Sequence, residues 1–270
     1  MSKAGRGGLD PEALDYYSDG AWYDAEYVHI GGDIPYYKQV ASETVGPILE
    51  LACGTGRLTI PMAEAAQDGV TGVDLMPSMI ARAEEKRVQH KLESKLRFVV
   101  DDMRSLRLNQ RFSAVILAFN TLMHMLEDAD LEAVLETARV HLAEGGTFHL
   151  DLHTPYPNLM SERDPRGRYD PQQMIDPRTQ QRWVVTENNQ YDPRTQINTM
   201  RFYYRRTDAR GRPSGPEREV CLRLRVIFPR ELDRWLHSAG FRIVGDFDDL
   251  GRSIPFTGKG GRRVLMVKAR

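Results

Sequence analysis

The chain has 270 residues, 41% of them hydrophobic, and its 37 Lys and Arg against 38 Asp and Glu give a formal net charge of −1. This hydrophobic content is sufficient for a core and excludes a disordered chain. Because no basic excess is available to neutralise a row of phosphates, we expect no nucleic acid partner.

The cysteines and the apolar runs of the sequence indicate in which cellular compartment the protein is expected. Cys53 and Cys221 are the two cysteines of the sequence, so we predict no disulfide framework and a reducing compartment. The first residues lack the apolar core of a signal peptide, and no apolar run reaches the length of a membrane span. We therefore expect a soluble cytoplasmic protein with no membrane partner.

The N-terminal segment 1–46 is predicted to be a helical lid. Residues 1–11 are Gly-rich and polar, and DPEALDYY predicts a helix with Asp10 as N-cap and Pro11 in its first turn. The aromatic-rich segment Ala21–Gly46 predicts a second helix or a lid.

From Pro47 onwards, strand and helix patterns alternate. PILELA, GVTGVDL, LRFVVDD, SAVILAF and GTFHLDLH predict strands, with helices expected over Arg57–Ala66, Pro77–His90 and Asp128–Leu142. Alternation in units of this length favours right-handed crossovers and a parallel sheet with helices on both faces. We assign 47–154 to this α/β domain, which resumes at 229–270.

The pattern changes after His153. RWVVTENNQY, INTMRFYYRR and REVCLRLRVIF predict three strands joined by short turns, which is typical of an antiparallel meander. We interpret 155–228 as an antiparallel β insertion that acts as a substrate cover or an oligomer contact. PRELDRWLHSAGF then predicts a helix, and FRIVGDFDD and RRVLMVKAR predict an antiparallel ending.

The stretch LELACGTGRL, residues 49–58, places a glycine pair after a strand. Glycines there let a ligand approach main-chain N–H groups at the start of the next helix. Asp74, 24 positions beyond Glu50, ends the next strand. A carboxylate at that place can accept hydrogen bonds from both ribose hydroxyls, although it can also cap the helix that follows.

A pyrophosphate ligand does not suit this turn. The G-x-G-x-x-G fingerprint requires another glycine near Thr59, and none is present. Glu50 also precedes the glycines, and its carboxylate repels phosphates. The pattern therefore favours a ligand with an amino group or a cation.

These motifs resemble those of the class I S-adenosylmethionine-dependent methyltransferases. ELACGTGR resembles their first motif, GVDLMPSMIARAEEK the second and VVDDMRSL the third, and AVILAFNTLMHML and AEGGTFHLDLHTP resemble the later ones. The resemblance implies a Rossmann-like, mostly parallel doubly wound sheet with an antiparallel last strand. Within this family, the sequence is similar in particular to small-molecule N-methyltransferases of the sugar-amine type.

The resemblance also implies cofactor contacts. Glu50 and the backbone of Ala52, Gly54 and Gly56 are expected around the methionine part of S-adenosyl-L-methionine, and Asp74 at the ribose. The remaining expected contacts are Leu75 and Met79 beside the adenine, Asp102 and Met103 at its amino edge, and the Phe119 backbone near the sulfonium. Alanine at position 52 is a mild departure, because family members often have glycine there.

Candidate catalytic residues follow from the same resemblance. His124, in FNTLMHML, is the candidate general base; the alternative is a histidine that packs in the loop or caps the next helix. Tyr16 and Tyr23 match two family tyrosines, spaced seven apart, that meet the cofactor carboxylate or frame the substrate. We expect the other aromatic residues of this segment, Tyr17, Trp22 and Tyr27, to pack.

Two further features of the sequence could belong to a site. His149, Asp151 and His153 share one strand face and could ligate a metal; only the strand end opens to the crevice, so we predict no metal and consider His153 a substrate contact. Arg57 is either a surface residue at the helix start or a contact to the cofactor carboxylate.

We predict an enzyme that methylates a nitrogen of a small molecule. The alternatives are a small-molecule O-methyltransferase, an RNA methyltransferase, which the near-neutral charge disfavours, and a non-catalytic relative that binds the cofactor. The expected partner is a small-molecule methyl acceptor, with a homodimer as a further expectation. The sequence does not name the acceptor, because loops and insertions determine that choice.

Overall fold

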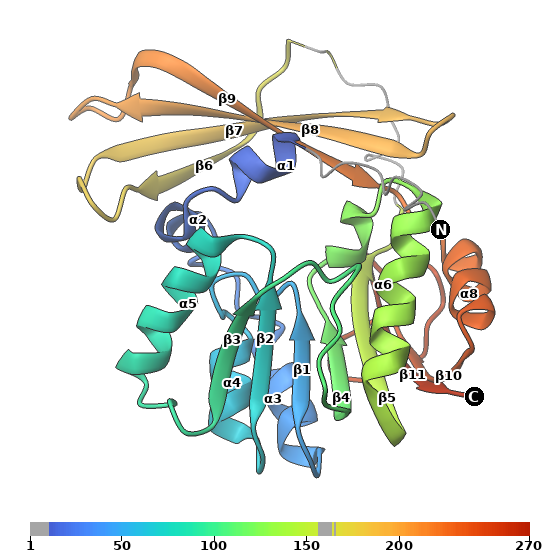
Figure 1. Cartoon of the computed structure of the whole chain (residues 1–270). Coiled ribbons are helices and arrows are strands. Elements are labelled where there is room, and N and C mark those ends of the chain that lie inside the picture. Colours follow the sequence, from blue (N-terminus) through green and yellow to red (C-terminus); the bar gives the residue numbers. More distant parts are fainter. Residues whose placement is uncertain (1–10, 156–163, 165) are drawn as a thin grey trace, which may run out of the picture.

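The computed structural model describes residues 11–155, 164 and 166–270, and its larger sheet has the strand order β10-β11-β5-β4-β1-β2-β3. Strands β1 to β5 run parallel to one another, whereas β11 is antiparallel to both β5 and β10. The bounds are β1 Ile48–Leu51, β2 Val70–Asp74, β3 Leu96–Val100, β4 Phe112–Leu117, β5 Leu142–His153, β10 Phe241–Phe247 and β11 Arg262–Ala269. The predicted doubly wound α/β fold with an antiparallel last strand is confirmed (Figure 1).

Helices cover both faces of this sheet because its strands are apolar on both sides. In β1, Leu49 and Leu51 belong to the core under α6 and α8, whereas Ile48 belongs to the core under α3 and α4. The helices are α3 Ile34–Glu43, α4 Thr59–Ala65, α5 Pro77–Gln89, α6 Asp128–His141 and α8 Pro229–Ser238. The sequence predicted α4, α5 and α6 to within two residues at each end.

A second sheet is built from the segment predicted as an insertion. Its antiparallel strands follow chain order: β6 Tyr169–Ile175, β7 Arg182–Asp192, β8 Ile197–Thr207 and β9 Pro213–Arg225. The prediction of three strands missed β6, which is an edge strand whose register shifts between Tyr169 and Gln172. Pro171 falls in that irregularity, where the missing N–H removes no ladder bond. Strand β9 starts at Pro213, five residues before the segment REVCLRLRVIF that predicted it.

The helices of residues 11–46 divide between the two sheets, and their role as a lid stays a prediction. Helices α1 (Pro11–Tyr16) and α2 (Gly20–Glu26) join the core of the second sheet, whereas α3 packs on the larger sheet. Asp24 of α2 also pairs with Arg82 and Lys86 of α5, so α2 bridges the two sheets. The predicted cap Asp10 lies outside the described residues.

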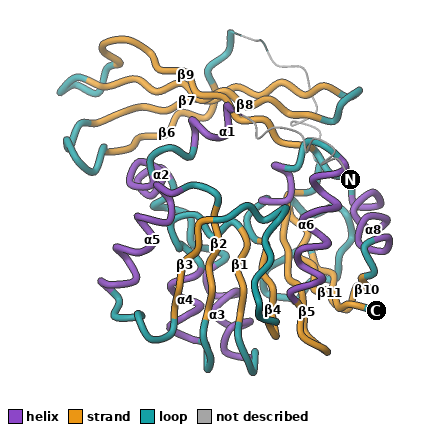
Figure 2. The backbone as a smooth tube through the Cα atoms, viewed as in Figure 1, coloured by secondary structure: helices purple, strands orange, loops and turns teal. Residues whose placement is uncertain are grey.

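The two sheets form separate layers, with α1 and α2 between them (Figure 2). The second sheet faces the end of the larger sheet at which β1, β2 and β4 finish (Figure 1). Across the part of the chain that the structure describes, no helix is long and apolar enough to cross a membrane.

Candidate functional site

A cavity of about 470 Å³ lies at the carboxyl ends of the parallel strands. Its walls come from the ends of β1 and β2, the loops after β3 and β4, helix α1, and the side chains Ile197 and Arg223 of the second sheet. This volume is in the range of small-molecule sites. Among the described residues, the predicted site residues line the cavity except Tyr16, Gly56 and His153.

Glu50 supplies a buried carboxyl group to the cavity. Its side chain lies in the middle of β1, is 3% exposed, and accepts a hydrogen bond of 2.5 Å from the Thr59 hydroxyl. Burial raises the pKa of Glu50 to about 8, against smaller lowering effects of Thr59 and Arg57. A cation bound beside Glu50 would therefore stabilise its ionised form.

The glycine turn after β1 has three left-handed residues. The φ angles are 54° at Ala52, 55° at Gly54 and 78° at Gly56. At Gly56 a Cβ atom would lie 3.1 Å from the Phe98 ring, so this glycine serves packing rather than the cavity. Alanine pays a steric cost at position 52 that glycine would not.

Asp74 ends β2 and is fixed by the backbone of the neighbouring turns. One carboxylate oxygen accepts from the Gly54 N–H at 2.8 Å, and the other accepts from the Met76 N–H at 2.9 Å. Burial raises the pKa of Asp74, opposed by these backbone hydrogen bonds. Each oxygen keeps acceptor capacity toward the cavity, as a ribose diol requires. Leu75 and Met79 line the cavity beside it.

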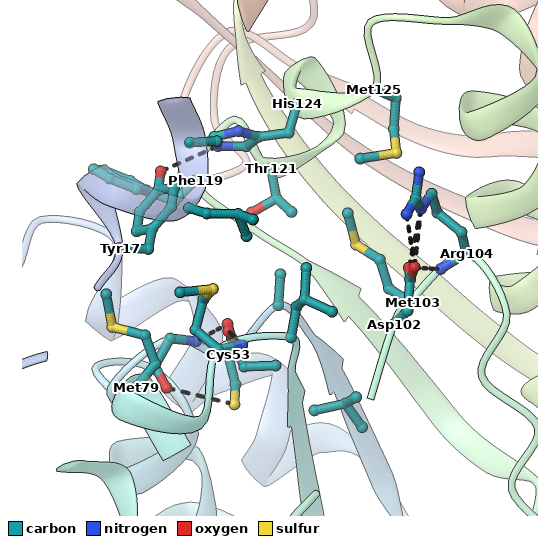
Figure 3. A pocket seen from close by; sticks show the side chains of 18 of the residues that line it. Tyr17, Cys53, Met79, Asp102, Met103, Arg104, Phe119, Thr121, His124 and Met125 are labelled. Atoms are coloured by element: carbon teal, nitrogen blue, oxygen red, sulfur yellow. Dashed lines mark hydrogen bonds and ion pairs between the residues drawn. The ribbon is translucent and has the colours of Figure 1, made fainter. Parts of the chain in front are cut away.

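Asp102 has a structural partner within the cavity wall. Its carboxylate pairs with the Arg104 guanidinium at 2.8 Å (Figure 3). Arg104 also pairs with Asp130 of α6 at 2.9 Å. The expected contact between Asp102 and an adenine amine stays a prediction, since the contact has to share the carboxylate with Arg104. Met103 lines the cavity next to it.

Arg57 faces the cavity rather than the surface. Its guanidinium makes two hydrogen bonds to Asp33, of 2.6 and 2.7 Å, and lies 4.7 Å from the centre of the Phe119 ring. Asp33 is buried, so the pair is shielded from solvent. Asp33 balances the charge of Arg57 and fixes its guanidinium in the cavity wall, where its N–H groups could donate to a carboxylate ligand.

His124 lies at the other end of the cavity, in the short 3-10 helix η1 (Thr121–His124). Its Nε2 atom lies 3.2 Å from the Tyr17 hydroxyl (Figure 3). Burial raises the pKa of Tyr17 well above its usual value, so the phenol stays protonated near neutral pH. Tyr17 and His124 therefore form a hydrogen-bonded pair that lines the cavity.

The sequence pointed to Tyr16, whereas the structure places Tyr17 in the cavity. The Tyr16 hydroxyl hydrogen-bonds Glu26 at 3.1 Å and Tyr27 at 2.7 Å within the core of the second sheet. Tyr17 directly follows the last residue of α1, and successive residues there point to different sides. The family spacing indicated Tyr16, which points away from the cavity, and the expectation that Tyr17 only packs was wrong. Tyr23 lines the cavity and stacks on Tyr27, and its contact to the cofactor or substrate stays a prediction.

The residues of HLDLH do not converge on a metal site. His149 bonds Tyr36 and Thr147, and burial lowers its pKa to about 4. Asp151 pairs with Arg262, and the His153 ring bonds the Gly261 carbonyl. Within residues 11–155, 164 and 166–270, no group of three such side chains could hold a metal ion. His153 does not line the cavity.

The sequence and the fold of this chain match those of known methyltransferases. Residues 48–146 match the family model described as a methyltransferase domain. A dTDP-3-amino-3,6-dideoxy-alpha-D-glucopyranose N,N-dimethyltransferase of Streptomyces fradiae is 29% identical over 130 residues, 45% of this chain and 48% of that protein. The chain thus spans about half the length of the curated relatives that it matches.

Solved structures match over nearly the whole chain. The CcbJ methyltransferase from Streptomyces caelestis is 26% identical, with a TM-score of 0.71 over 88% of this chain and 95% of that one. An S-adenosylmethionine-dependent methyltransferase from Clostridium acetobutylicum is 20% identical, with a TM-score of 0.74 over 92% of this chain and 97% of that one. The chain therefore contains a methyltransferase domain, in residues 48–146, and has the fold of the class I S-adenosylmethionine-dependent methyltransferases that its motifs resemble.

Proposed function

We propose that this protein transfers a methyl group from S-adenosylmethionine to a nitrogen of a small molecule. The observation that carries the proposal is that Glu50 and Asp74, from adjacent strands, line one cavity that Tyr17 and His124 also line. The relatives named above include an amino-sugar N,N-dimethyltransferase, which supports nitrogen as the acceptor atom.

The donor end suits the cofactor group by group. Glu50 would pair with its ammonium, Arg57 would attract its carboxylate, and Asp74 would accept from its ribose hydroxyls, while Leu75 and Met79 would cover its flat base. When bound, S-adenosylmethionine supplies a methyl group on a sulfonium, a good leaving group. The protein's task is then to align the acceptor, exclude water and remove a proton.

The acceptor end supplies the proton chemistry. As the nitrogen lone pair forms the N–C bond, the C–S bond breaks and its electron pair stays on sulfur, so the nitrogen must lose a proton. His124 would take that proton, directly or through one water, and the protonated Tyr17 phenol would orient its ring. A histidine that only packs, the alternative raised by the sequence, would not need to face the cavity.

A carboxylate on the rim favours an amine as the acceptor. Glu127 lines the cavity, is exposed, and has no ion-pair partner among the described residues. Such a charge attracts an ammonium group before it is deprotonated. A hydroxyl acceptor gains nothing from it.

The second sheet would act as a cover for the acceptor. Ile197 and Arg223 reach into the cavity wall from β8 and β9, which supports the substrate-cover interpretation of segment 155–228. The alternative role as an oligomer contact, a homodimer and a cytoplasmic location stay predictions of the sequence.

Calorimetry with S-adenosylhomocysteine tests the donor half of the proposal. We expect one binding site per chain; no binding would contradict the proposal. A screen of amines, hydroxyl compounds and RNA for methyl uptake then separates the alternatives. Uptake by an amine supports the proposal, uptake by a hydroxyl compound or RNA replaces it, and binding without any uptake favours a non-catalytic relative.

A further inference from the structure

The turn after β4 has an unusual backbone. Phe119 and Asn120 are consecutive left-handed residues, with φ angles of 56° and 62°. Neither is glycine, so each such residue is costly and persists only when its surroundings hold it in place. The turn links β4 to η1 and therefore sets where His124 lies.

Asp151 of β5 accepts two hydrogen bonds from this turn. Its Oδ1 accepts from the Phe119 N–H at 3.0 Å, and its main-chain carbonyl accepts from the Asn120 N–H at 3.2 Å. Both left-handed residues thus donate their N–H groups to one residue of the neighbouring strand. The Asn120 side chain returns a contact, accepting from the His153 N–H at 2.6 Å.

The Asp151 carboxylate is itself fixed on its other sides. Its side chain is 0% exposed and pairs with Arg262 of β11 at 2.5 Å, and Tyr37 of α3 donates to Oδ1 at 2.5 Å. A buried charge that is paired and hydrogen-bonded in this way is rigid. Asp151 therefore joins α3, β11 and the turn in one network.

The turn contributes to both ends of the cavity. The Phe119 ring lies under Arg57 at the donor end, whereas Thr121 and His124 follow toward the acceptor end (Figure 3). We propose that Asp151 is a positioning residue. It fixes the Phe119–Asn120 turn, so that Phe119 and His124 keep a constant position relative to each other. Its consequence for methyl transfer rests on the proposed function, whereas its effect on the turn does not.

The same strand and helix offer a matched control. Tyr36, next to Tyr37 on α3, donates or accepts a 3.1 Å hydrogen bond with buried His149 of β5. This pair joins the same two elements as Tyr37 and Asp151, and within the described part of the chain it makes no hydrogen bond to the turn. Tyr36→Phe thus removes one buried phenol as Tyr37→Phe does, at a place that leaves the turn untouched.

Hydrogen–deuterium exchange of the full chain reads out the turn directly. In Asp151→Asn and in the milder Tyr37→Phe, we expect peptides covering residues 118–123 to exchange roughly tenfold faster or more, because the hydrogen bond to Phe119 is weakened. Peptides of β1 and β2 should stay as in the wild type, and Tyr36→Phe should leave 118–123 unchanged.

Calorimetry with S-adenosylhomocysteine gives the second readout. Asp151→Asn and Tyr37→Phe should raise its Kd by about tenfold, while Tyr36→Phe stays within twofold of the wild type. Unchanged exchange at 118–123 in both test variants, or equal effects of Tyr36→Phe and Tyr37→Phe, would overturn the positioning role. If the wild type binds no S-adenosylhomocysteine, the proposed function fails and the exchange arm still decides on Asp151.

Discussion

The donor and acceptor ends of the cavity are built in different ways. At the donor end, Glu50 and Asp74 belong to two adjacent strands, and the backbone of the following turns fixes Asp74. At the acceptor end, Tyr17, His124 and Arg223 come from three distant parts of the chain and are fixed by side chains.

This difference separates the part of the site that depends on the fold from the part that single side chains determine. A site held by main-chain groups depends on the fold and tolerates little change in it. A site held by side-chain pairs can change its chemistry by single substitutions while the sheet stays intact. We therefore expect variants of the donor end to lose the cofactor, and variants of the acceptor end to lose turnover or acceptor affinity alone.

The largest effect is expected at Asp74. Asp74→Ala removes the acceptor of both ribose hydroxyls, and hydrogen bonds to a charged group contribute roughly 1.5–3 kcal/mol each. We expect calorimetry to show an S-adenosylhomocysteine Kd raised at least about 100-fold. Asp68→Ala, in the exposed loop before β2, is the control; similar losses in both variants would point to misfolding instead.

The next effect separates the two ends. His124→Ala should slow methyl transfer by about 100-fold or more, as expected for loss of a general base, and should leave the Kd for S-adenosylhomocysteine within twofold. Tyr17→Phe should slow it less, because the imidazole stays. The measurement is the rate under saturating donor with an acceptor found by the screen. A collapse of cofactor affinity in His124→Ala would contradict the role given to His124.

Arg223 tests whether the second sheet touches the acceptor. Arg223 and Arg218 lie on β9, and each pairs with an acid of α1 at 3.6 Å, Glu12 and Asp15. Arg223 lines the cavity and Arg218 does not. We expect Arg223→Gln to raise the KM for the acceptor about tenfold, with Arg218→Gln near the wild type. Equal values in the two variants would remove the second sheet from the acceptor site.

Glu50 makes donor binding depend on pH. In the free protein its pKa is raised to about 8 by burial, so the carboxyl group is mostly protonated at pH 6 to 7 and must release a proton to pair with an ammonium. Affinity should therefore rise with pH, by up to about tenfold per unit, until the donor's own amino group titrates near 7.7–8.0. Calorimetry in buffers of different ionisation enthalpy would detect the released proton. Glu50→Gln should abolish the slope, and a flat wild-type profile would contradict the pairing.

The smallest effect concerns Ala52. Its φ of 54° costs more for alanine than for glycine, so Ala52→Gly should raise the free energy of unfolding by about 0.5–1 kcal/mol after the entropic cost of glycine. Denaturant unfolding measures this change. Ala81→Gly, on the exposed side of α5, should show the opposite sign, and a destabilised Ala52→Gly would refute the strain at position 52.

The sequence predicted the donor end well because its signals are local. Glu50, Gly54 and Asp74 lie within one strand–turn–helix–strand unit, where a strand end fixes the position of each side chain. Tyr17 was missed because a six-residue helix gives too little periodicity to decide which of two adjacent tyrosines turns inward.

Other features could not be predicted because they depend on distant contacts. Strand β6 was missed because Pro171 and its glutamines do not resemble a strand; the pairing with β7 stabilises it. Asp151 was seen as part of a histidine–aspartate pattern, but its partners Tyr37, Phe119 and Arg262 come from separate elements. A local sequence pattern cannot predict a network whose members lie far apart in the chain.

A crystal structure of the protein with S-adenosylhomocysteine would test the central claim most directly. We predict the ribose hydroxyls within hydrogen-bond distance of the Asp74 carboxylate, the ammonium beside Glu50, and the sulfur pointing toward Phe119 and His124. A ligand bound in the cavity with Glu50 and Asp74 directed away from it, or bound elsewhere on the molecule, would contradict the account.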